Sequence, residues 1–209
     1  MSEEMLYARS DGSLNTGALP DSGSFSAWHL LGHTATRGDV LTESFAHVIA
    51  TYCDPHCSPF VPALGLSHAA FTGLLQTRLP HFTPPPHWLD AQRAAVGTAG
   101  PLGEFPDLLQ LLLDHRATAD KQHRRVAHLV ACACMGNDHL WQDLGLPGRK
   151  ALSALLSSHF PTLAARNTGD MKWKKFFYKQ LCEREGINAC KSPSCAACAD
   201  YDKCFGAEE

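Results

Sequence analysis

Apolar residues recur at helical spacing through most of the chain. From Asp39, a residue type suited to a helix N-cap, they fall at Leu41, Phe45, Val48, Ile49 and Tyr52, the stripe of an amphipathic helix. Similar spacing recurs at 66–79, 105–113, 126–135 and 151–160, with Pro- and Gly-rich breaks between these stretches. Neither β-type alternation nor a repeat of fixed period stands out. The pattern predicts an all-α fold, a bundle of about six or seven helices.

A last helix is predicted between Gly169 and Gly186, and its faces differ in character. One arc is aromatic and apolar, with Trp173, Phe176, Phe177 and Leu181. Another carries a basic row at positions i, i+3 and i+7, formed by Lys172, Lys175 and Lys179. A solvated face, which would include Lys174, is the usual meaning of such a row. Because a cluster of cysteines follows directly, the row could also balance thiolate charge, dock a partner or contact an anion.

That cluster places four of the nine cysteines within fifteen residues, in the sequence CKSPSCAACADYDKCFG. The spacing is Cys190-x4-Cys195-x2-Cys198-x5-Cys204. The segment is polar and broken by Pro193, so an irregular loop is expected. Short, unequal gaps are typical of iron–sulfur ligands, whereas structural zinc sites more often pair two knuckles across a longer loop. The spacing therefore favours a cluster over zinc, and free core cysteines are the remaining alternative.

Composition and charge indicate which partners and which cellular compartment are expected for this chain. An apolar content of 44% suits a packed core, and a formal net charge of -3 with 19% charged residues gives no general field for nucleic acid or anionic lipid. The first residues lack the basic and apolar regions of a signal peptide, and no long apolar run follows, which predicts a cytoplasmic protein with no membrane segment. Cytoplasmic thiols stay reduced, so metal binding or packing is expected for the cysteines.

Five cysteines lie outside the loop, namely Cys53, Cys57, Cys132, Cys134 and Cys182. The first two, with His47 and His56 nearby, could form a second soft-metal site, but a helix end with buried or incidental cysteines is favoured. The next pair are two residues apart in a predicted helix and point about 200° apart, which indicates core positions. Cys182 is interpreted as a spare or packing residue rather than a fifth thiolate.

The chain is expected to have three parts. Residues 1–25, rich in Gly and Ser, are predicted to be a flexible tail. Residues 26–168 are predicted to form the helical body. Residues 169–209 hold the basic-aromatic helix and the four-cysteine loop.

Several stretches closely resemble the NifQ family of nitrogen-fixation proteins. They are HLWQDLGL at 139–146, FPTLAARN at 160–167, MKWKKFFYKQLCEREG at 171–186, and the cysteine loop with its CFG ending. The cysteine spacing matches the family motif without a gap. The resemblance implies an iron–sulfur protein that also carries molybdenum and delivers it to assembly of the nitrogenase iron–molybdenum cofactor. It maps the cluster ligands onto Cys190, Cys195, Cys198 and Cys204.

The resemblance also implies partners. These are the scaffold on which the nitrogenase cofactor is built, the nitrogenase iron protein, and molybdate or a molybdenum–sulfur species. It implies a carrier with no catalytic residues. Two other functions remain open from the residues alone. One is a ferredoxin-like redox or electron-transfer protein, and the other is a zinc-stabilised interaction module that uses MKWKKFFYK as its surface.

Overall fold

The computed structural model describes residues 7–8, 14–15, 26–34, 38–56, 58–98, 103–186, 198 and 201–208. Within these ranges the regular structure is helical apart from two short antiparallel strands, β1 (Tyr7–Ala8) and β2 (Leu14–Asn15). The all-α prediction is therefore confirmed for the described residues. The predicted flexible tail, residues 1–25, lies outside them except for this strand pair.

The helices follow one another along the described chain. They are α1 (Ala27–Leu31), α2 (Val40–Tyr52), the 3-10 helix η1 (Pro62–Gly65), α3 (His68–Arg78), α4 (Pro86–Thr98), α5 (Phe105–Asp114), α6 (Lys121–Cys134), α7 (Leu140–Asp143), α8 (Arg149–His159), α9 (Pro161–Ala164), α10 (Trp173–Arg184) and α11 (Tyr201–Phe205).

The predicted number of helices, six or seven, is too low, for two physical reasons. Helices α1, α7, α9 and α11 have only four or five residues each, which is too short to show a periodic apolar stripe. Helix α4 begins at Pro86, inside a stretch interpreted as a break. Proline is well tolerated in the first turn of a helix, where its missing N–H would have no partner.

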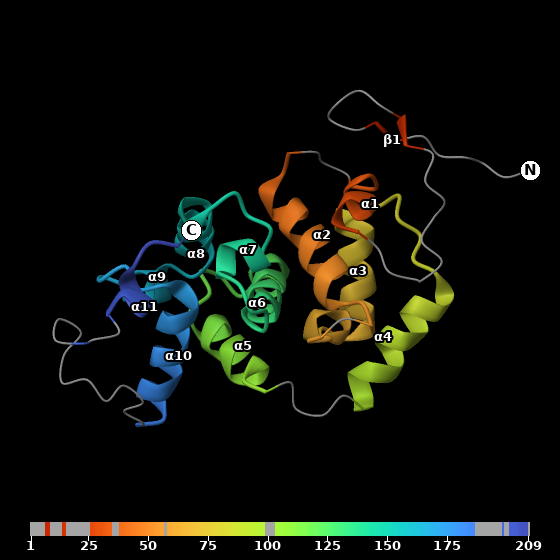
Figure 1. Cartoon of the computed structure of the whole chain (residues 1–209). Helices are drawn as coiled ribbons and strands as arrows, with labels where there is room; N and C mark the ends of the chain where they lie inside the picture. Colours follow the sequence, from red (N-terminus) through yellow and green to blue (C-terminus); the bar gives the residue numbers. More distant parts are fainter. Residues whose placement is uncertain are drawn as a thin grey trace, which may run out of the picture.

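Helix α6 is the centre of the fold. It contacts α2, α5, α7 and η1, and every residue from Val126 to Cys134 is buried. In Figure 1, α1 to α4 lie on one side of α6 and α8 to α11 on the other. Because neighbours surround its C-terminal half, this part of the helix buries all its faces rather than a single stripe.

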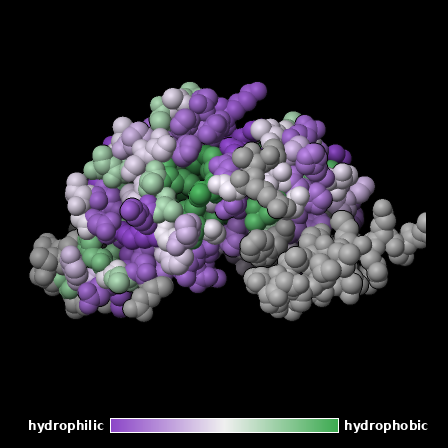
Figure 2. Space-filling view, turned by 90° about the horizontal axis from the view of Figure 1, so that it is seen from above, coloured by the Kyte–Doolittle hydropathy of each residue, from purple (hydrophilic) through white to green (hydrophobic). Residues whose placement is uncertain are grey.

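The surface has a different character from this core. Seen from above, it is mostly polar around a hydrophobic area near its centre (Figure 2). Two large hydrophobic side chains among the described residues are exposed, Val40 and Tyr201. None of the described helices is long and apolar enough to cross a membrane.

Helix α10 is held on the body by its aromatic arc, as predicted. Trp173, Phe176, Phe177 and Leu181 are all buried, and the first three rings pack against one another with centroids 5.8–6.0 Å apart. The Trp173 Nε1–H donates to Ser153 Oγ in α8 at 3.1 Å. Helix α10 also contacts α5. These contacts fix the helix from which the cysteine loop continues.

Truncating a side chain of this arc is expected to lower the stability of the protein. Trp173→Ala or Phe176→Ala should lower the free energy of unfolding by about 3–5 kcal/mol, because each removes a buried aromatic side chain and leaves a cavity. Val40→Ala, at a side chain that is 45% exposed, is the control and should change it by less than about 0.5 kcal/mol. Chemical denaturation measures both, and equal midpoints for all variants would contradict the anchoring role.

Candidate metal-cluster site

The cysteine loop follows Gly186, just after α10, and its last cysteine lies in the short helix α11. Of the four predicted ligands, Cys190 and Cys195 lie outside the described residues. Cys198 and Cys204 are described, and both are free and partly exposed. The Cys198 carbonyl accepts a hydrogen bond from the Tyr201 N–H at 3.2 Å, at the start of α11. These two thiols are therefore reachable from solvent.

The segment carrying Cys204 is attached to the beginning of α10. The Lys172 N–H donates to the Cys204 carbonyl at 2.7 Å, which places α11 beside the N-terminal end of α10 (Figure 1). Gly206 closes α11 by donating its N–H to the Asp202 carbonyl at 2.8 Å. A Cβ at Gly206 would lie 2.5 Å from that oxygen, so the glycine of the CFG ending allows this close approach.

The stretch leading into α10 has its own support. The Asn167 side chain makes two hydrogen bonds with the backbone of Met171, accepting from its N–H and donating to its carbonyl, each at 2.9 Å. Asn167 is the last residue of the FPTLAARN motif. The FPTLAARN motif therefore shapes the turn before Lys172, and Lys172 binds the Cys204 carbonyl.

The chain leaves α10 at its C-terminal end, and α11 lies beside its N-terminal end. Helix α10 has 12 residues, which corresponds to a length of about 18 Å. Cys182 lies in its last turn, about 15 Å along the axis from Lys172 and hence from the Cys204 backbone. Cys182 and the Cys204 backbone therefore lie at opposite ends of α10.

The buried thiols among the described body residues differ chemically from the two described loop thiols. Cys53, Cys132 and Cys134 are buried, and burial raises the pKa of the Cys53 and Cys134 thiols to about 12. Burial, together with the neighbouring Cys53, also raises the pKa of Cys132. The Cys53 thiol donates to the Val61 carbonyl at 3.4 Å. These three groups stay protonated near neutral pH, so they suit packing rather than metal binding.

The second soft-metal site considered around Cys53 is not formed by the described residues. No three His, Cys, Asp or Glu side chains in the described part of the chain converge on a point that could hold a metal ion. Cys57 lies outside the described residues. His128, on the same face of α6 as Cys132, hydrogen-bonds through Nδ1 to the Leu64 carbonyl at 3.0 Å, and burial lowers its pKa to about 4. It is a neutral core histidine.

The lysines of α10 divide into two groups. Lys175 and Lys179 are exposed, and Lys172, the N-cap residue, is partly buried. Lys179 lies 3.7 Å from Glu183, a pair open to solvent. The solvated face predicted for this row is wrong at Lys174, whose ammonium group pairs with the Asp143 carboxylate and donates to the Gly136 carbonyl at 2.8 Å.

Asp143 is the centre of a buried polar network. Its side chain is 6% exposed, and its Oδ1 accepts from the Tyr52 hydroxyl at 2.7 Å. Burial and this carboxylate raise the pKa of Tyr52. A Cβ at Gly136 would lie 2.1 Å from the Tyr52 hydroxyl, so only glycine fits there. Sequence reasoning missed this network, although Asp143 lies within the HLWQDLGL motif and was the signal that could have revealed it.

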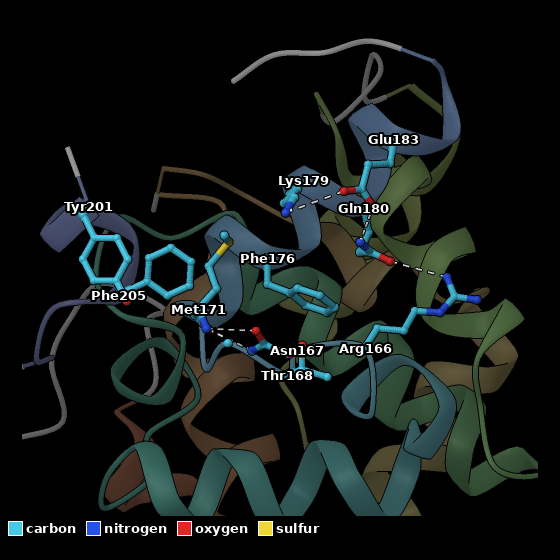
Figure 3. Close-up of a pocket in the computed structure, with 11 residues that line it drawn as sticks. Arg166, Asn167, Thr168, Met171, Phe176, Lys179, Gln180, Glu183, Tyr201 and Phe205 are labelled. Atoms are coloured by element: carbon cyan, nitrogen blue, oxygen red, sulfur yellow. Dashed lines mark hydrogen bonds and ion pairs between the residues drawn. The ribbon is translucent and has the colours of Figure 1, made fainter. Parts of the chain in front are cut away.

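A groove of about 690 Å³ lies between α10, α11 and the turn before α10. Figure 3 shows Tyr201 and Phe205 on one side and Arg166 and Gln180 on the other. The two aromatic rings stack with centroids 4.6 Å apart, and Arg166 donates to Gln180 Oε1 at 3.4 Å. The groove therefore combines an aromatic wall with polar and basic groups beside the cysteine segment.

These features define a class of protein: a helical body that presents a cysteine-rich segment from one end of a basic-aromatic helix. The chain belongs to the NifQ family, since the family model for NifQ matches residues 41–206. The match extends well upstream of the motifs that carry the sequence resemblance. NifQ is associated with nitrogen fixation.

Individual relatives agree with this assignment. The chain is 53% identical over 105 residues to protein NifQ of Azotobacter vinelandii, covering 50% of this chain and 54% of that protein. It is 42% identical over 147 residues to a NifQ homolog of Sinorhizobium fredii, covering 70% and 62%, and 36% identical over 156 residues to NifQ of Rhodobacter capsulatus, covering 73% and 81%. The matches thus span little more than half the length of the first two relatives. No solved structure matches the chain significantly.

The Lys174–Asp143 pair gives a prediction about the site's support. Lys174→Met should lower the free energy of unfolding by about 3 kcal/mol or more, because it leaves the Asp143 carboxylate buried without its cation. Lys175→Met, one residue further along the same helix and exposed, should change it by less than about 0.5 kcal/mol. Denaturant titration of the two variants measures the difference. Similar values would show that Lys174 is solvated after all.

Proposed function

We propose that this chain carries molybdenum on an iron–sulfur cluster and donates it to assembly of the nitrogenase iron–molybdenum cofactor. The cluster ligands in this proposal are Cys190, Cys195, Cys198 and Cys204. Membership in the NifQ family supports the nitrogen-fixation context. The observation that carries the cluster proposal is the placement of the described loop thiols: Cys198 and Cys204 are partly exposed, and the Cys204 carbonyl is bound to the start of α10, whereas Cys53, Cys132 and Cys134 are buried.

The donor set fits the proposed group. Thiolates are the ligands that iron–sulfur clusters take, and a soft sulfur environment also suits molybdenum bound through sulfide. The lysine row on α10 brings positive charge to the helix that leads into the loop, where it would offset the negative charge of a thiolate-bound cluster. Transfer by exchange of thiolate ligands requires no catalytic residue from this chain, so we propose a carrier and not an enzyme.

The proposed acceptors are the scaffold of the nitrogenase cofactor and the nitrogenase iron protein. Between Arg166 and Gly186 the sequence has five basic and three acidic residues besides Lys174, which pairs with the buried Asp143, while the whole chain has a net charge of -3. The basic region lies next to the groove and to the Cys204 segment. An acceptor with an acidic surface would therefore dock with its own ligands close to the metal.

Single replacements of the loop cysteines test the ligand set. Replacing Cys190, Cys195, Cys198 or Cys204 with Ser should reduce bound iron, sulfide and molybdenum severely, because serine oxygen is harder and rarely ionised. The helical content should stay unchanged. Metal and sulfide are counted per chain after reconstitution without oxygen.

Two matched controls accompany these variants. Cys182→Ser alters a partly exposed thiol shortly before the loop, and Cys134→Ala alters a buried one; both should keep parental metal content. Full occupancy in any two loop variants would overturn the ligand assignment. In the parent protein, iron without molybdenum would favour the redox carrier, and one zinc in a colourless protein would favour the interaction module.

The basic row gives a second test, now of docking. The triple variant Lys172→Glu, Lys175→Glu, Lys179→Glu should donate molybdenum to its acceptor about tenfold more slowly at low salt, and the difference should shrink as ionic strength rises. Lys121→Glu with Lys150→Glu, at exposed positions on α6 and α8, is the control and should transfer at the parental rate. Equal rates for the triple variant and the parent at every ionic strength would refute docking through this row.

A further inference from the structure

A buried carboxylate fastens the segment after α11 to the body. The Glu208 side chain is 4% exposed, and its Oε1 accepts from Arg149 Nη1 at 2.5 Å. The same oxygen lies 3.9 Å from His139 Nδ1. Arg149 is the first residue of α8 and His139 directly precedes α7. The chain beyond the last loop cysteine is thus bound to two elements of the helical body.

The same arginine also holds the entry to α10. Its Nη2 donates to the Asp170 carboxylate at 2.8 Å and to the carbonyls of Asp170 and Met171, each at 2.9 Å. One guanidinium therefore joins residue 208 to residues 170 and 171. A planar group with five fixed donors suits this bridging role, which a lysine could not fill.

These contacts form a closed loop of interactions that includes Cys204. From Glu208 the chain runs back four residues to Cys204, whose carbonyl accepts from the Lys172 N–H. Lys172 follows Met171, which is bound by Arg149. The Cys204 backbone is therefore held in two ways. Its carbonyl is hydrogen-bonded to Lys172, and Arg149 binds both Glu208 and Met171. These contacts of Arg149 are called the arginine clasp.

We propose that Arg149 and Glu208 are positioning residues that hold Cys204 where the metal cluster requires it; this inference rests on the proposed function of the loop. The energetics favour a positioning role. Burying a carboxylate is costly, and the second oxygen, Glu208 Oε2, is buried without a hydrogen-bond partner among the described residues. Buried ion pairs often add little net stability but fix one geometry, and breaking one leaves an uncompensated charge. A clasp of this kind restricts the segment more than it stabilises the fold.

Asp170 offers a matched comparison because it contacts the same arginine from a different environment. Its side chain is 80% exposed, so water can replace the lost interaction. Asp170 also has a φ of 52°, which Asn tolerates well. Glu208→Gln and Asp170→Asn thus each remove one carboxylate charge from Arg149, one buried and one solvated.

The first measurement is hydrogen exchange of the Lys172 and Gly206 amides in the metal-free protein. Glu208→Gln should accelerate exchange at Lys172 about tenfold, which corresponds to about 1.4 kcal/mol of local opening. Asp170→Asn should exchange at nearly the parental rate. Phe71→Leu, at a fully buried position in α3, lowers global stability away from the clasp and corrects for general destabilisation. Parental exchange in Glu208→Gln would overturn the clasp.

The second measurement is the rate at which an iron chelator removes the cluster from anaerobically reconstituted protein. Glu208→Gln should lose its cluster several times faster than the parent, Asp170→Asn and Phe71→Leu. Faster exchange with an unchanged rate of cluster loss would overturn the positioning role for Cys204. If the parent itself binds no cluster, the proposed function fails and the positioning role fails with it, whereas the exchange experiment still decides whether the clasp holds the segment.

Discussion

The position of α10 depends on one buried carboxylate, that of Asp143. It accepts from Tyr52 in α2 and pairs with Lys174 in α10, and it belongs to α7, so three elements meet at a single charge. In a poorly solvated environment an unpaired carboxylate would cost several kcal/mol, which makes this arrangement strongly preferred over a rotated or shifted α10. The aromatic arc supplies the apolar contacts, and the ion pair selects the register. The beginning and the end of the cysteine loop follow from that choice.

A loop of this composition depends on its attachments. Residues 187–200 include only one large aliphatic residue, Ile187, so their sequence offers little apolar surface to offset the entropy of ordering. The protein fixes the two flanks instead, by placing α10 on the body and by binding the Cys204 carbonyl to Lys172. Under the proposed function, the metal cluster would supply the remaining constraint through its four thiolate bonds. Binding and release of the cargo would then change the loop without disturbing the helical core.

Among the described cysteines, burial separates Cys53, Cys132 and Cys134 from the partly exposed Cys182, Cys198 and Cys204. In the core, desolvation disfavours the thiolate, and the pKa of Cys134 is raised to about 12 even though Lys174 acts in the opposite direction. Metal ions and clusters need the deprotonated form. The same residue type can therefore serve packing in α6 and, as proposed, metal binding in the loop, with solvent access deciding between them.

The sequence by itself determined the helical class, the N-cap at Asp39 and the buried arc of α10, because these follow from local periodicity and side-chain polarity; the burial of both Cys132 and Cys134 depends on the elements that surround α6. It also determined the spacing of the four loop cysteines and the motifs of the family. The tertiary structure decided the rest. It removed Lys174 from the solvated row to pair with a carboxylate 31 residues away, and it brought Glu208 to Arg149 across 59 residues. A periodic pattern does not predict such pairs. The two partners lie far apart in the sequence, and they meet only because packing of the helices buries them at the same place.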